Sequence, residues 1–500
     1  ISENPFNWSL ELKVLAKCAQ RRGRDASGLV IARDGQYEVV RSNAPVLRLL
    51  RCVDMANSNI VMGHSRLVTN GIDDNQPVIR DGIIALHNGI VINADELWST
   101  TKQIRNQSID TEIILALINE TLGNGGNVSE AIRDVFSKCS GTISAAITLP
   151  NLGCLVLMTN NGSLYTGTKQ GAKFFSSEEY PLRQIDCEGI SPVKKSIIYD
   201  FNKNVPVINE RQMLQKKRRN LLPVHQNNLA QERLLVYEDP SLRRCSVCIL
   251  PETMPFIRFD KDGVCNYCLN YKSKNQTKPL SVLEDLIEPY RRRGQPDCIV
   301  PFSGGRDSSY ALHLAVKELG MRPITYTYDW GMVTDLARRN ISRMCSVLNV
   351  ENIIVAADID RKRDNIRKNL TAWLRRPHLG MLSMLTAGDK HFFQYVETVK
   401  QQTGISLNLW GVNPLEVTHF KAGFLGIPPA FEEKYVYSQG LQRQLRYQFK
   451  RAFQYLKNPG YLNSSLYDTV SGEYWRSIHK KADYFHLFDY WAWDENEVNR

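Results

Sequence analysis

Residues 297–319 constrain the fold more strongly than any other part of the chain. The run Asp297–Val300 is short and apolar, as in a buried strand, and Tyr310–Leu319 has helical periodicity, with Gly320 as the expected C-cap. Between them, the two glycines of Pro301–Ser309 allow the backbone to approach a ligand closely. The N–H groups and the dipole at the start of a helix favour an anion. The sequence therefore predicts an anion site between this strand and this helix.

Within this turn, three serines add hydroxyl donors, and Asp307 suits a Mg²⁺ ion that accompanies phosphates. The Gly-Lys-Ser/Thr ending of an ordinary P-loop is absent. Ser303-Gly-Gly-Arg-Asp307-Ser308 instead resembles the SGGxDS loop of the ATP pyrophosphatase superfamily, whose members cleave ATP to AMP and pyrophosphate. The alternative is a tight turn that binds nothing. The resemblance implies ATP-binding residues, with Asp307 both catalytic and a magnesium ligand: Ser303, Gly304, Gly305, Arg306, Asp307, Ser308 and Ser309.

Composition limits the class of protein and its surroundings. The 500 residues suggest about three domains, and 43% hydrophobic with 23% charged residues is typical of a globular chain. We find no secretory signal and no membrane-spanning run, so we expect a cytoplasmic protein. Eleven cysteines in such a chain favour reduced thiols and a metal site over disulfides. The net charge of +11 suits ATP, a phosphorylated substrate or RNA and does not choose between them.

Residues 1–190 contain strand-like and helical patterns. The strands are expected at Gly28–Ala32, Ile60–Gly63, Gly82–Leu86, Gly141–Leu149 and Cys154–Met158, and the helices at Leu10–Arg21 and Thr111–Leu122. Five motifs follow one another in this region: Arg22–Gly28, Gly63–Leu67, Asn75–Val78, Leu86–Asn93 and Ser108–Glu112. This series resembles the class II glutamine amidotransferase domain of asparagine synthetase and related enzymes. The resemblance implies an α/β fold of the four-layer αββα, N-terminal-nucleophile type that hydrolyses glutamine to ammonia.

The same resemblance assigns roles to four residues. Arg66 would bind the glutamine α-carboxylate through its planar guanidinium, and Asp110 the α-ammonium group. Asn88 and the backbone N–H of Gly89 would form the catalytic oxyanion hole. Taken singly, an Asn-Gly pair is typical of a turn, and an aspartate before a helix is typical of an N-cap.

The nucleophile of that family is a cysteine at the extreme N-terminus, activated by its own amino group. This chain begins at Ile1, and its first cysteine, Cys18, falls within a helical pattern. We therefore expect that a short strand carrying the cysteine precedes Ile1. The alternative is a domain without its nucleophile, which would leave free ammonia as the donor.

Two CxxC pairs follow the segment 191–240, which is expected to be a linker with a solvated basic run at Lys216–Arg219. The pairs are Cys245 with Cys248 and Cys265 with Cys268, within 241–272. This spacing predicts a structural zinc ribbon with four thiolate ligands, and Asp262-Gly263 is the expected turn between them. Redox pairs and an iron–sulfur cluster are the alternatives.

Residues 273–500 alternate between strands and helices, which predicts a parallel sheet covered on both faces, with a helical C-terminal extension. Ligands bind beyond the carboxyl ends of such strands, so Tyr328 and Asp329 are expected near the nucleotide. Strands are expected at Ile324–Asp329, Ile353–Ala356 and Ser406–Gly411, and helices at Pro279–Arg292, Thr334–Leu348, Arg361–Arg375, Met384–Gln402, Leu441–Tyr455 and Glu473–Tyr490.

Several further motifs resemble the N-acetyl sugar amidotransferases of surface-polysaccharide and flagellin-sugar biosynthesis, over about residues 240–430. They are Pro251–Pro255, Phe259–Asn266, Arg376–Met381, Ala387–Lys390, Trp410–Glu416 and Phe420–Phe424. Val412 and Arg306 depart from that family, where Glu and Lys are common. The resemblance implies six residues at the sugar end: His378, Asp389, Lys390, Asn413, Glu416 and Lys421.

The combined resemblances imply a glutamine- and ATP-dependent amidotransferase. The substrate would be an N-acetylated sugar or nucleotide sugar whose acetamido oxygen is adenylated, and ammonia would then give an acetamidino (amidine) group. An ammonia path lined by apolar and small residues is expected between the halves. Neither a membrane span nor nucleic acid is expected, and a homo-oligomer is left open. The alternatives are a tRNA-thiolating enzyme, an asparagine-synthetase-like enzyme that amidates a carboxylate, and a scaffold without activity.

Overall fold

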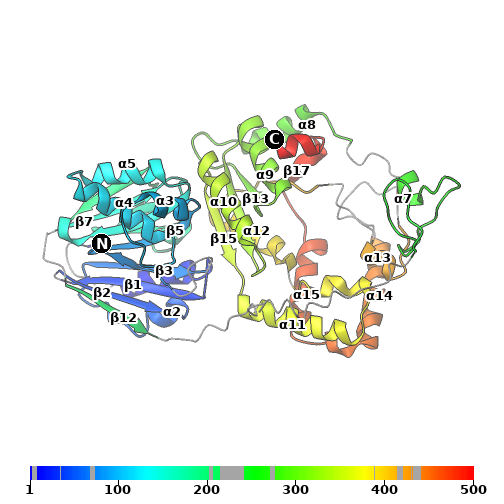
Figure 1. Ribbon diagram of the computed structural model, residues 1–500, viewed down its shortest axis with the longest axis horizontal. Helices are drawn as coiled ribbons and strands as arrows, with labels where there is room; N and C mark the ends of the chain where they lie inside the picture. Colours follow the sequence, from blue (N-terminus) through cyan, green and yellow to red (C-terminus); the bar gives the residue numbers. More distant parts are fainter. Residues whose placement is uncertain are drawn as a thin grey trace.

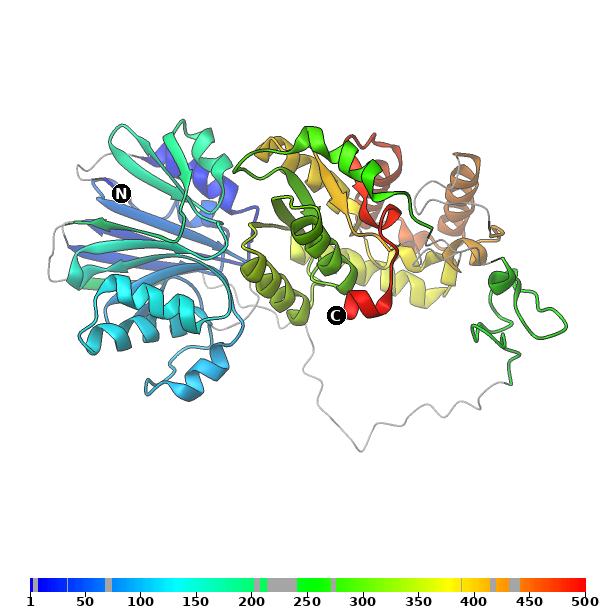
Figure 2. The same cartoon turned by 90° about the horizontal axis from the view of Figure 1, so that it is seen from above.

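A computed structural model describes residues 1–2, 8–33, 35–67, 74–201, 207–213, 241–270, 276–387, 389–413, 420–429, 431 and 441–500. The described chain forms an N-terminal half, a C-terminal half beside it, and a small cysteine-rich knot at the far end of the molecule (Figures 1 and 2). The expectations for Lys216–Arg219 and Glu416 lie outside the described residues. Within the described part, no helix is both long and apolar enough to cross a membrane.

The N-terminal half contains three sheets with strand orders β12-β2-β1-β3, β11-β7-β6-β5-β4 and β10-β8-β9. The strands are β1 Ala26–Arg33, β2 Gln36–Ser42, β3 Ile60–Arg66, β4 Val78–Arg80, β5 Ile83–Val91, β6 Gly141–Leu149, β7 Cys154–Thr159, β8 Tyr165–Lys169, β9 Ala172–Ser176, β10 Glu188–Pro192, β11 Ser196–Asp200 and β12 Val207–Met213. The helices are α1 Ser9–Ala19, α2 Val46–Leu49, α3 Ala94–Thr100, α4 Thr111–Gly123, α5 Val128–Lys138 and α6 Glu179–Gln184.

Inner strands of the two larger sheets are buried on both faces, and this explains the layering. Along β1, Val30 points into a core shared with β5, β6 and β7, whereas Leu29 packs with α1 and α2. Along β5, Leu86 joins the shared core, and Ala85 faces a third core formed with α4 and α5. The layers therefore follow the order helix, sheet, sheet, helix.

The sheets of this half continue past residue 190 into the segment expected to be a linker. β11 pairs antiparallel with β7, and β12 pairs parallel with β2. Both strands are mostly exposed edge strands, with burial patterns that mix polar and apolar positions. β11 has only five residues, and β12 is mostly polar, so neither gives a strong strand pattern in the sequence.

The C-terminal half is built on one parallel sheet with strand order β15-β14-β13-β16-β17. Its strands are β13 Cys298–Pro301, β14 Pro323–Asp329, β15 Asn352–Ala356, β16 Asn408–Trp410 and β17 Tyr484–His486. Its helices are α8 Leu280–Ile287, α9 Arg306–His313, α10 Asp335–Leu348, α11 Ile359–Arg375, α12 Phe392–Thr403, α13 Phe420–Phe424, α14 Leu441–Lys457, α15 Ser465–Glu473 and α16 Glu495–Asn499.

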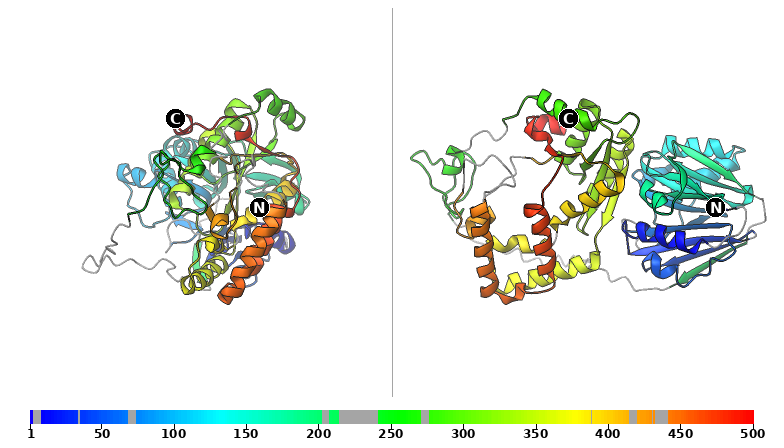
Figure 3. Two further views of the ribbon diagram at one scale, coloured as in Figure 1. Left: turned by 90° about the vertical axis from the view of Figure 1, so that its right-hand side faces the viewer. Right: turned by 180° about the vertical axis from the view of Figure 1, so that it is seen from behind.

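Helices cover both faces of this sheet, as the βα alternation predicts. On β13, Cys298 and Val300 pack in one core with α8 and α9, and Ile299 packs in a second core with α12. Beyond the sheet, α11, α14 and α15 form a helical extension (Figure 3). Here Lys362 is buried and donates to Asp468 at 2.8 Å, which ties α11 to α15.

Two expected helices of this half are wrong in part. The run Glu473–Tyr490 is helical only in its first residues, up to η8 Tyr474–Ile478, and then forms β17. Tyr484 and Phe485 have the aromatic character of a strand, and pairing with β16 at the sheet edge decides their conformation. The expected helix Met384–Gln402 begins only at Phe392, because the segment before it forms the short turns η4 Leu379–Met384 and η5 Asp389–His391.

Helix α10 joins the two halves. Ser342 Oγ accepts a hydrogen bond from Thr142 N and donates one to Ile90 O, both at 2.8 Å. A Cβ on Gly141 would lie 2.9 Å from the same hydroxyl, so the helix and β6 approach closely. A second contact is the hydrogen bond from Tyr165 to the Glu351 carboxyl, 2.7 Å long and buried. Burial raises the pKa of Glu351 to about 8, so this carboxyl is largely protonated at neutral pH.

The Glu351 carboxyl at the contact between the two halves should make the free energy of unfolding depend on pH. Because folding raises the Glu351 pKa from an ordinary 4.5 to about 8, the folded state binds a proton that the unfolded chain releases. The contribution of Glu351 to the free energy of unfolding is complete below pH 4.5 and is lost as the pH rises through 8. The free energy of unfolding then changes by at most about 1.4 kcal/mol per pH unit. Glu351→Gln keeps the acceptor oxygen and should flatten the pH profile of the thermal unfolding midpoint.

Glu188→Gln is the matched control, because this carboxylate is exposed on β10. The control should follow the wild-type profile. Parallel profiles for wild type and Glu351→Gln would contradict the prediction.

Candidate functional site

Four residues with expected roles in glutamine binding line one cavity of about 300 Å³. Arg66 ends β3, Asn88 and Gly89 lie in β5, and Asp110 directly precedes α4. Strands β1 and β3 pair in one sheet, and β5 and β6 in the other, so the residues meet where the two sheets face each other. The structure thus brings together residues that are up to 44 positions apart in the chain.

The Asn88-Gly89 pair is in a strand and not in a turn. The two residues pair with Ser144 and Ile143 of β6. Gly89 has φ of +152°, and a Cβ there would lie 2.0 Å from Thr142 O. A side chain at this position would therefore push the two strands apart.

Asp110 does not use its side chain to cap α4. Instead, its Oδ2 accepts a hydrogen bond from Val91 N at 2.8 Å, and the residue is 6% exposed. Arg66 is also buried, at 4% exposure, and its Nη1 donates to the carbonyl of Asp74. A buried cation and a buried carboxylate at one cavity suit the two charged groups of an α-amino acid.

Two histidines, His87 buried and His64 partly buried, line the same cavity and stay neutral. Burial, and then the charge of Arg66, lower the pKa of His64 to about 3. Burial also lowers the pKa of His87, whose ring contacts Thr111 Oγ1 at 3.2 Å. Gln76 exchanges two hydrogen bonds with the backbone of His87, at 2.7 and 2.8 Å. This explains why an Asn-Gln-Pro motif accompanies the His-Asn-Gly motif in the sequence.

The cavity continues into the C-terminal half. Its lining there includes Thr327, Asp329, Val333 and Arg338, and α10 forms one of its walls with Ile341. Asp329 accepts from the Arg338 guanidinium at 2.7 and 3.2 Å, and its other oxygen accepts from Gly331 N. Asp329 is buried and Arg338 is partly buried, so Asp329 is a fixed polar group at the end of β14. No sequence motif indicates Arg338, which lies nine residues further along the chain.

The anion loop lies at the carboxyl end of β13, as the sequence predicts. Ser308 Oγ lies 3.0 Å from Ser303 Oγ and donates to Gly305 O at 2.9 Å. Gly304 has φ of +73°, and a Cβ there would lie 2.3 Å from Ala337 O of α10. Asn340 of α10 donates to Gly304 O at 3.1 Å. Helix α10 therefore touches the loop with one face and the cavity with another.

The remaining nucleotide candidates divide into two groups. Ser303, Arg306 and Ser309 are exposed or partly exposed around the start of α9. Tyr328 is buried and stacks on Tyr395 with ring centroids 5.1 Å apart, so its ring serves the core beside the strand end. Asp307 accepts from Trp493 Nε1 at 2.8 Å, a partner that the sequence did not reveal.

The described candidates for the sugar end lie on several different elements. His378 precedes η4, against which α13 with Lys421 packs. Lys390 lies elsewhere, paired with Glu473 beside η8. Asn413 is buried, whereas the side chain of Asp389 and the whole of Glu416 lie outside the described part.

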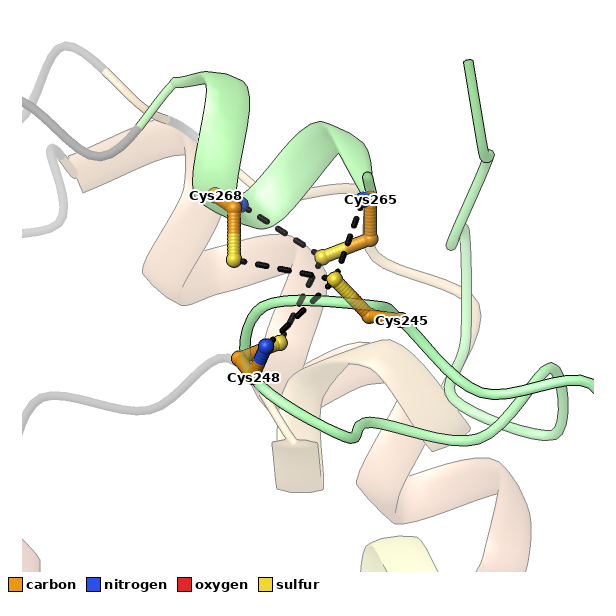
Figure 4. Close-up of side chains that lie close together, drawn as sticks. All are labelled: Cys245, Cys248, Cys265 and Cys268. Carbon is orange, nitrogen blue, oxygen red and sulfur yellow. Dashed lines mark hydrogen bonds between the residues drawn. The ribbon is translucent and has the colours of Figure 1, made fainter. Parts of the chain in front are cut away.

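The four cysteines of the knot come together (Figure 4). Their sulfurs all lie within 4.8 Å of one another, in a chain segment that includes the short helix α7 Asn266–Leu269. Cys245 Sγ accepts from Cys265 N at 3.2 Å, and Cys265 Sγ from Cys268 N at 3.4 Å. Burial opposes ionisation of Cys245, but three backbone N–H donors lower its pKa to about 6.

This geometry fits a metal. Four thiolates at mutual contact suit tetrahedral Zn²⁺, and the N–H donors stabilise their charge. The expected turn is present, since Gly263 has φ of +78° and its N–H donates to Asp260 O at 3.2 Å. The knot contacts α13, where a Cβ on Gly423 would lie 2.9 Å from Pro255. We therefore interpret the knot as a structural element that supports α13.

Comparison with known proteins finds similarity for part of the first half. Residues 64–184 match the glutamine amidotransferase domain. Over 193 residues the chain is 26% identical to glutamine–fructose-6-phosphate aminotransferase of Mesorhizobium japonicum, covering 37% of this chain and 30% of that protein. It is 32% identical over 158 residues to 7-cyano-7-deazaguanine synthase of Saccharolobus solfataricus, covering 29% of this chain and 33% of that protein. The chain thus spans about a third of the length of these relatives.

Solved structures align at low scores. Glutamine phosphoribosylpyrophosphate amidotransferase of B. subtilis aligns over 85% of this chain and 91% of its own, with 14% identity and a TM-score of 0.33. NMN synthetase from Francisella tularensis aligns over 41% of this chain and 95% of its own, with 14% identity and a TM-score of 0.21. Scores this low carry no argument about the fold.

Gly304→Ala should lower the free energy of unfolding of the C-terminal half by about 1–3 kcal/mol. The backbone at residue 304 is left-handed, and the new Cβ would also clash with Ala337 O. Thermal unfolding without ligands measures the effect. Gly305→Ala is the control, since its Cβ would meet only the rotatable Ser303 hydroxyl at 3.3 Å. Equal shifts for both variants would show that α10 does not constrain the loop.

The knot should hold one zinc ion per chain, measured by inductively coupled plasma mass spectrometry. Cys265→Ser removes a buried ligand and should abolish zinc retention and make the knot sensitive to protease. Cys52→Ser, an exposed cysteine outside the cluster, should retain zinc. Bound iron, or no metal in the wild type, would contradict the prediction.

Proposed function

We propose that this chain is a glutamine- and ATP-dependent amidotransferase. The observation that carries the proposal is the cavity that begins at Arg66, Asn88 and Asp110 and reaches Asp329 at the end of β14. A glutamine amidotransferase domain thus shares an internal space with a parallel sheet that bears an anion loop. Ammonia released at one end would reach the other without passing through water, where it would be protonated.

At the first end, Arg66 and Asp110 would hold the glutamine backbone groups, and Asn88 with the Gly89 N–H would stabilise the oxyanion. The resemblance implies a cysteine nucleophile for this step. Neutral His64 and His87 leave Arg66 as the cation that meets the glutamine carboxylate. These roles account for the burial of both charged residues.

At the second end, the loop Ser303–Ser309 would bind the phosphates of ATP. Asp307 would hold a Mg²⁺ ion, which supplies charge neutralisation when it is bound. Ser303, Gly304, Gly305 and Ser308 would donate to the phosphate oxygens. Arg306 adds a positive charge at the loop, and Asp329 fixes the wall between the loop and the cavity.

The acceptor that we propose is the acetamido group of an N-acetylated sugar or nucleotide sugar. Transfer of AMP from ATP to its carbonyl oxygen releases pyrophosphate and makes an imidate. Ammonia then adds to the carbon, and the carbon–oxygen bond breaks, so AMP leaves and an amidine remains. His378 and Lys421, which lie on neighbouring elements, are candidates for binding this sugar.

The reaction is tested with full-length protein, MgATP, amide-¹⁵N glutamine and a panel of acetamido sugars and nucleotide sugars. The expected products are glutamate, AMP, pyrophosphate and a sugar in which one oxygen is replaced by ¹⁵NH. Release of AMP with aspartate as acceptor, or with tRNA and a sulfur donor, would favour the alternative enzymes. Absence of glutamate and AMP under every condition would overturn the proposal.

Blocking the cavity should uncouple the two ends. Val333→Trp fills its wall in the C-terminal half, so AMP formation with glutamine should fall roughly tenfold, equivalent to about 1.4 kcal/mol. Glutamate should still form, and an added ammonium salt should restore AMP formation. Steady-state assays of glutamate and AMP measure both.

Leu336→Trp is the matched control, because Leu336 is 69% exposed on α10. This variant should keep wild-type coupling. Loss of glutamine-dependent and ammonium-dependent AMP formation to the same extent in Val333→Trp would argue against a shared path.

A further inference from the structure

Two successive residues of the anion loop are held by the segment that leads into α16. Trp493 Nε1 donates to Asp307 Oδ1 at 2.8 Å. The Arg306 guanidinium pairs with Glu495 at 2.9 Å and lies over the Trp493 ring, 5.2 Å from its centroid. The end of the chain lies beside α9 in the structure (Figure 1). The segment therefore covers the start of the helix that faces the proposed phosphates.

The hydrogen bond from Trp493 orients the Asp307 carboxylate without forming an ion pair with it. An indole N–H is a neutral donor, so the carboxylate keeps its negative charge. Its Oδ2 accepts no hydrogen bond within the described ranges, and the side chain is 18% exposed. One oxygen is thus fixed, and the other remains available to a cation.

The contacts of Arg306 keep a competing cation away from that carboxylate. Arg306 Nε lies 4.0 Å from Asp307 Oδ1, which makes a long ion pair that a small rotation would shorten. The bond to Glu495 and the contact with the Trp493 ring restrict this rotation. Glu495 is itself oriented by the start of α16, where Asp494 Oδ1 accepts from Asn496 N at 2.8 Å. The exposed Arg306–Glu495 ion pair adds little to the free energy of unfolding, so its main effect is to orient the Arg306 guanidinium.

We propose that Trp493 is a positioning residue of the ATP site, which orients Asp307 for a divalent cation, and that Glu495 keeps Arg306 from occupying the same carboxylate. The inference rests on the proposed function, since it assumes that the loop binds a metal–pyrophosphate group. It adds residues about 190 positions away from the loop, which no loop motif contains.

Manganese binding without turnover tests this role. Electron paramagnetic resonance measures free Mn²⁺ during titration of the full chain in the presence of inorganic pyrophosphate. Trp493→Phe keeps the ring and removes the donor, and should weaken Mn²⁺ binding about threefold to tenfold. Glu495→Gln should weaken it in the same direction. Glu497→Gln, on the same helix but next to Arg500, should bind as the wild type does.

Activity gives a second readout. The magnesium concentration for half-maximal AMP formation should rise in Trp493→Phe and Glu495→Gln, whereas the KM for glutamine should stay constant. A purely structural role would instead lower the thermal unfolding midpoint and leave the magnesium dependence unchanged.

The outcomes separate the two hypotheses. Wild-type affinity for Mn²⁺ and pyrophosphate in folded Trp493→Phe and Glu495→Gln would overturn the positioning role and leave the proposed function intact. Absence of Mn²⁺–pyrophosphate binding in the wild type would overturn both. If Trp493→Phe failed to fold, Glu495→Gln, an exposed substitution, would still decide the question.

Discussion

The packing of α10 between the two halves is the contact on which the arrangement depends. Ser342 binds the backbone of β5 and β6, while Ala337 and Asn340, on other positions of the same helix, touch Gly304 of the anion loop. A single rigid helix therefore sets both the wall of the shared cavity and the conformation of the loop. Any shift of α10 relative to β6 would change both at once, which gives a physical route for coupling the two sites.

The sequence predicted most of the fold because its strands are strongly apolar and its motifs are local. β6, β7 and β14 are buried along their whole length, and their bounds follow the apolar runs closely. Edge strands escaped prediction. β12 is mostly polar, and β17 lies in an aromatic run that also fits a helix, so pairing with distant strands decides their conformation.

The sequence predicted those parts of the candidate site that depend on the spacing of residues within a short motif. It did not predict contacts between residues that lie far apart in the chain. The loop glycines and the CxxC pairs specify their own geometry, and the amidotransferase motifs lie in recognisable order. The partners Arg338, Trp493 and Glu351 have no local signal, since each acts across a gap of nine to about 190 residues. Similarly, only the structure separates His378 from Lys390, which the sequence motifs had grouped together.

The order of elements along the chain has a consequence for synthesis. The strands of the first half are complete once Met213 has emerged, whereas β16 gains its neighbour β17 only with Tyr484–His486. A chain interrupted between these points would carry a finished amidotransferase domain beside a sheet with an open edge. Exposed edges of this kind pair with other chains, so such fragments would be prone to aggregate.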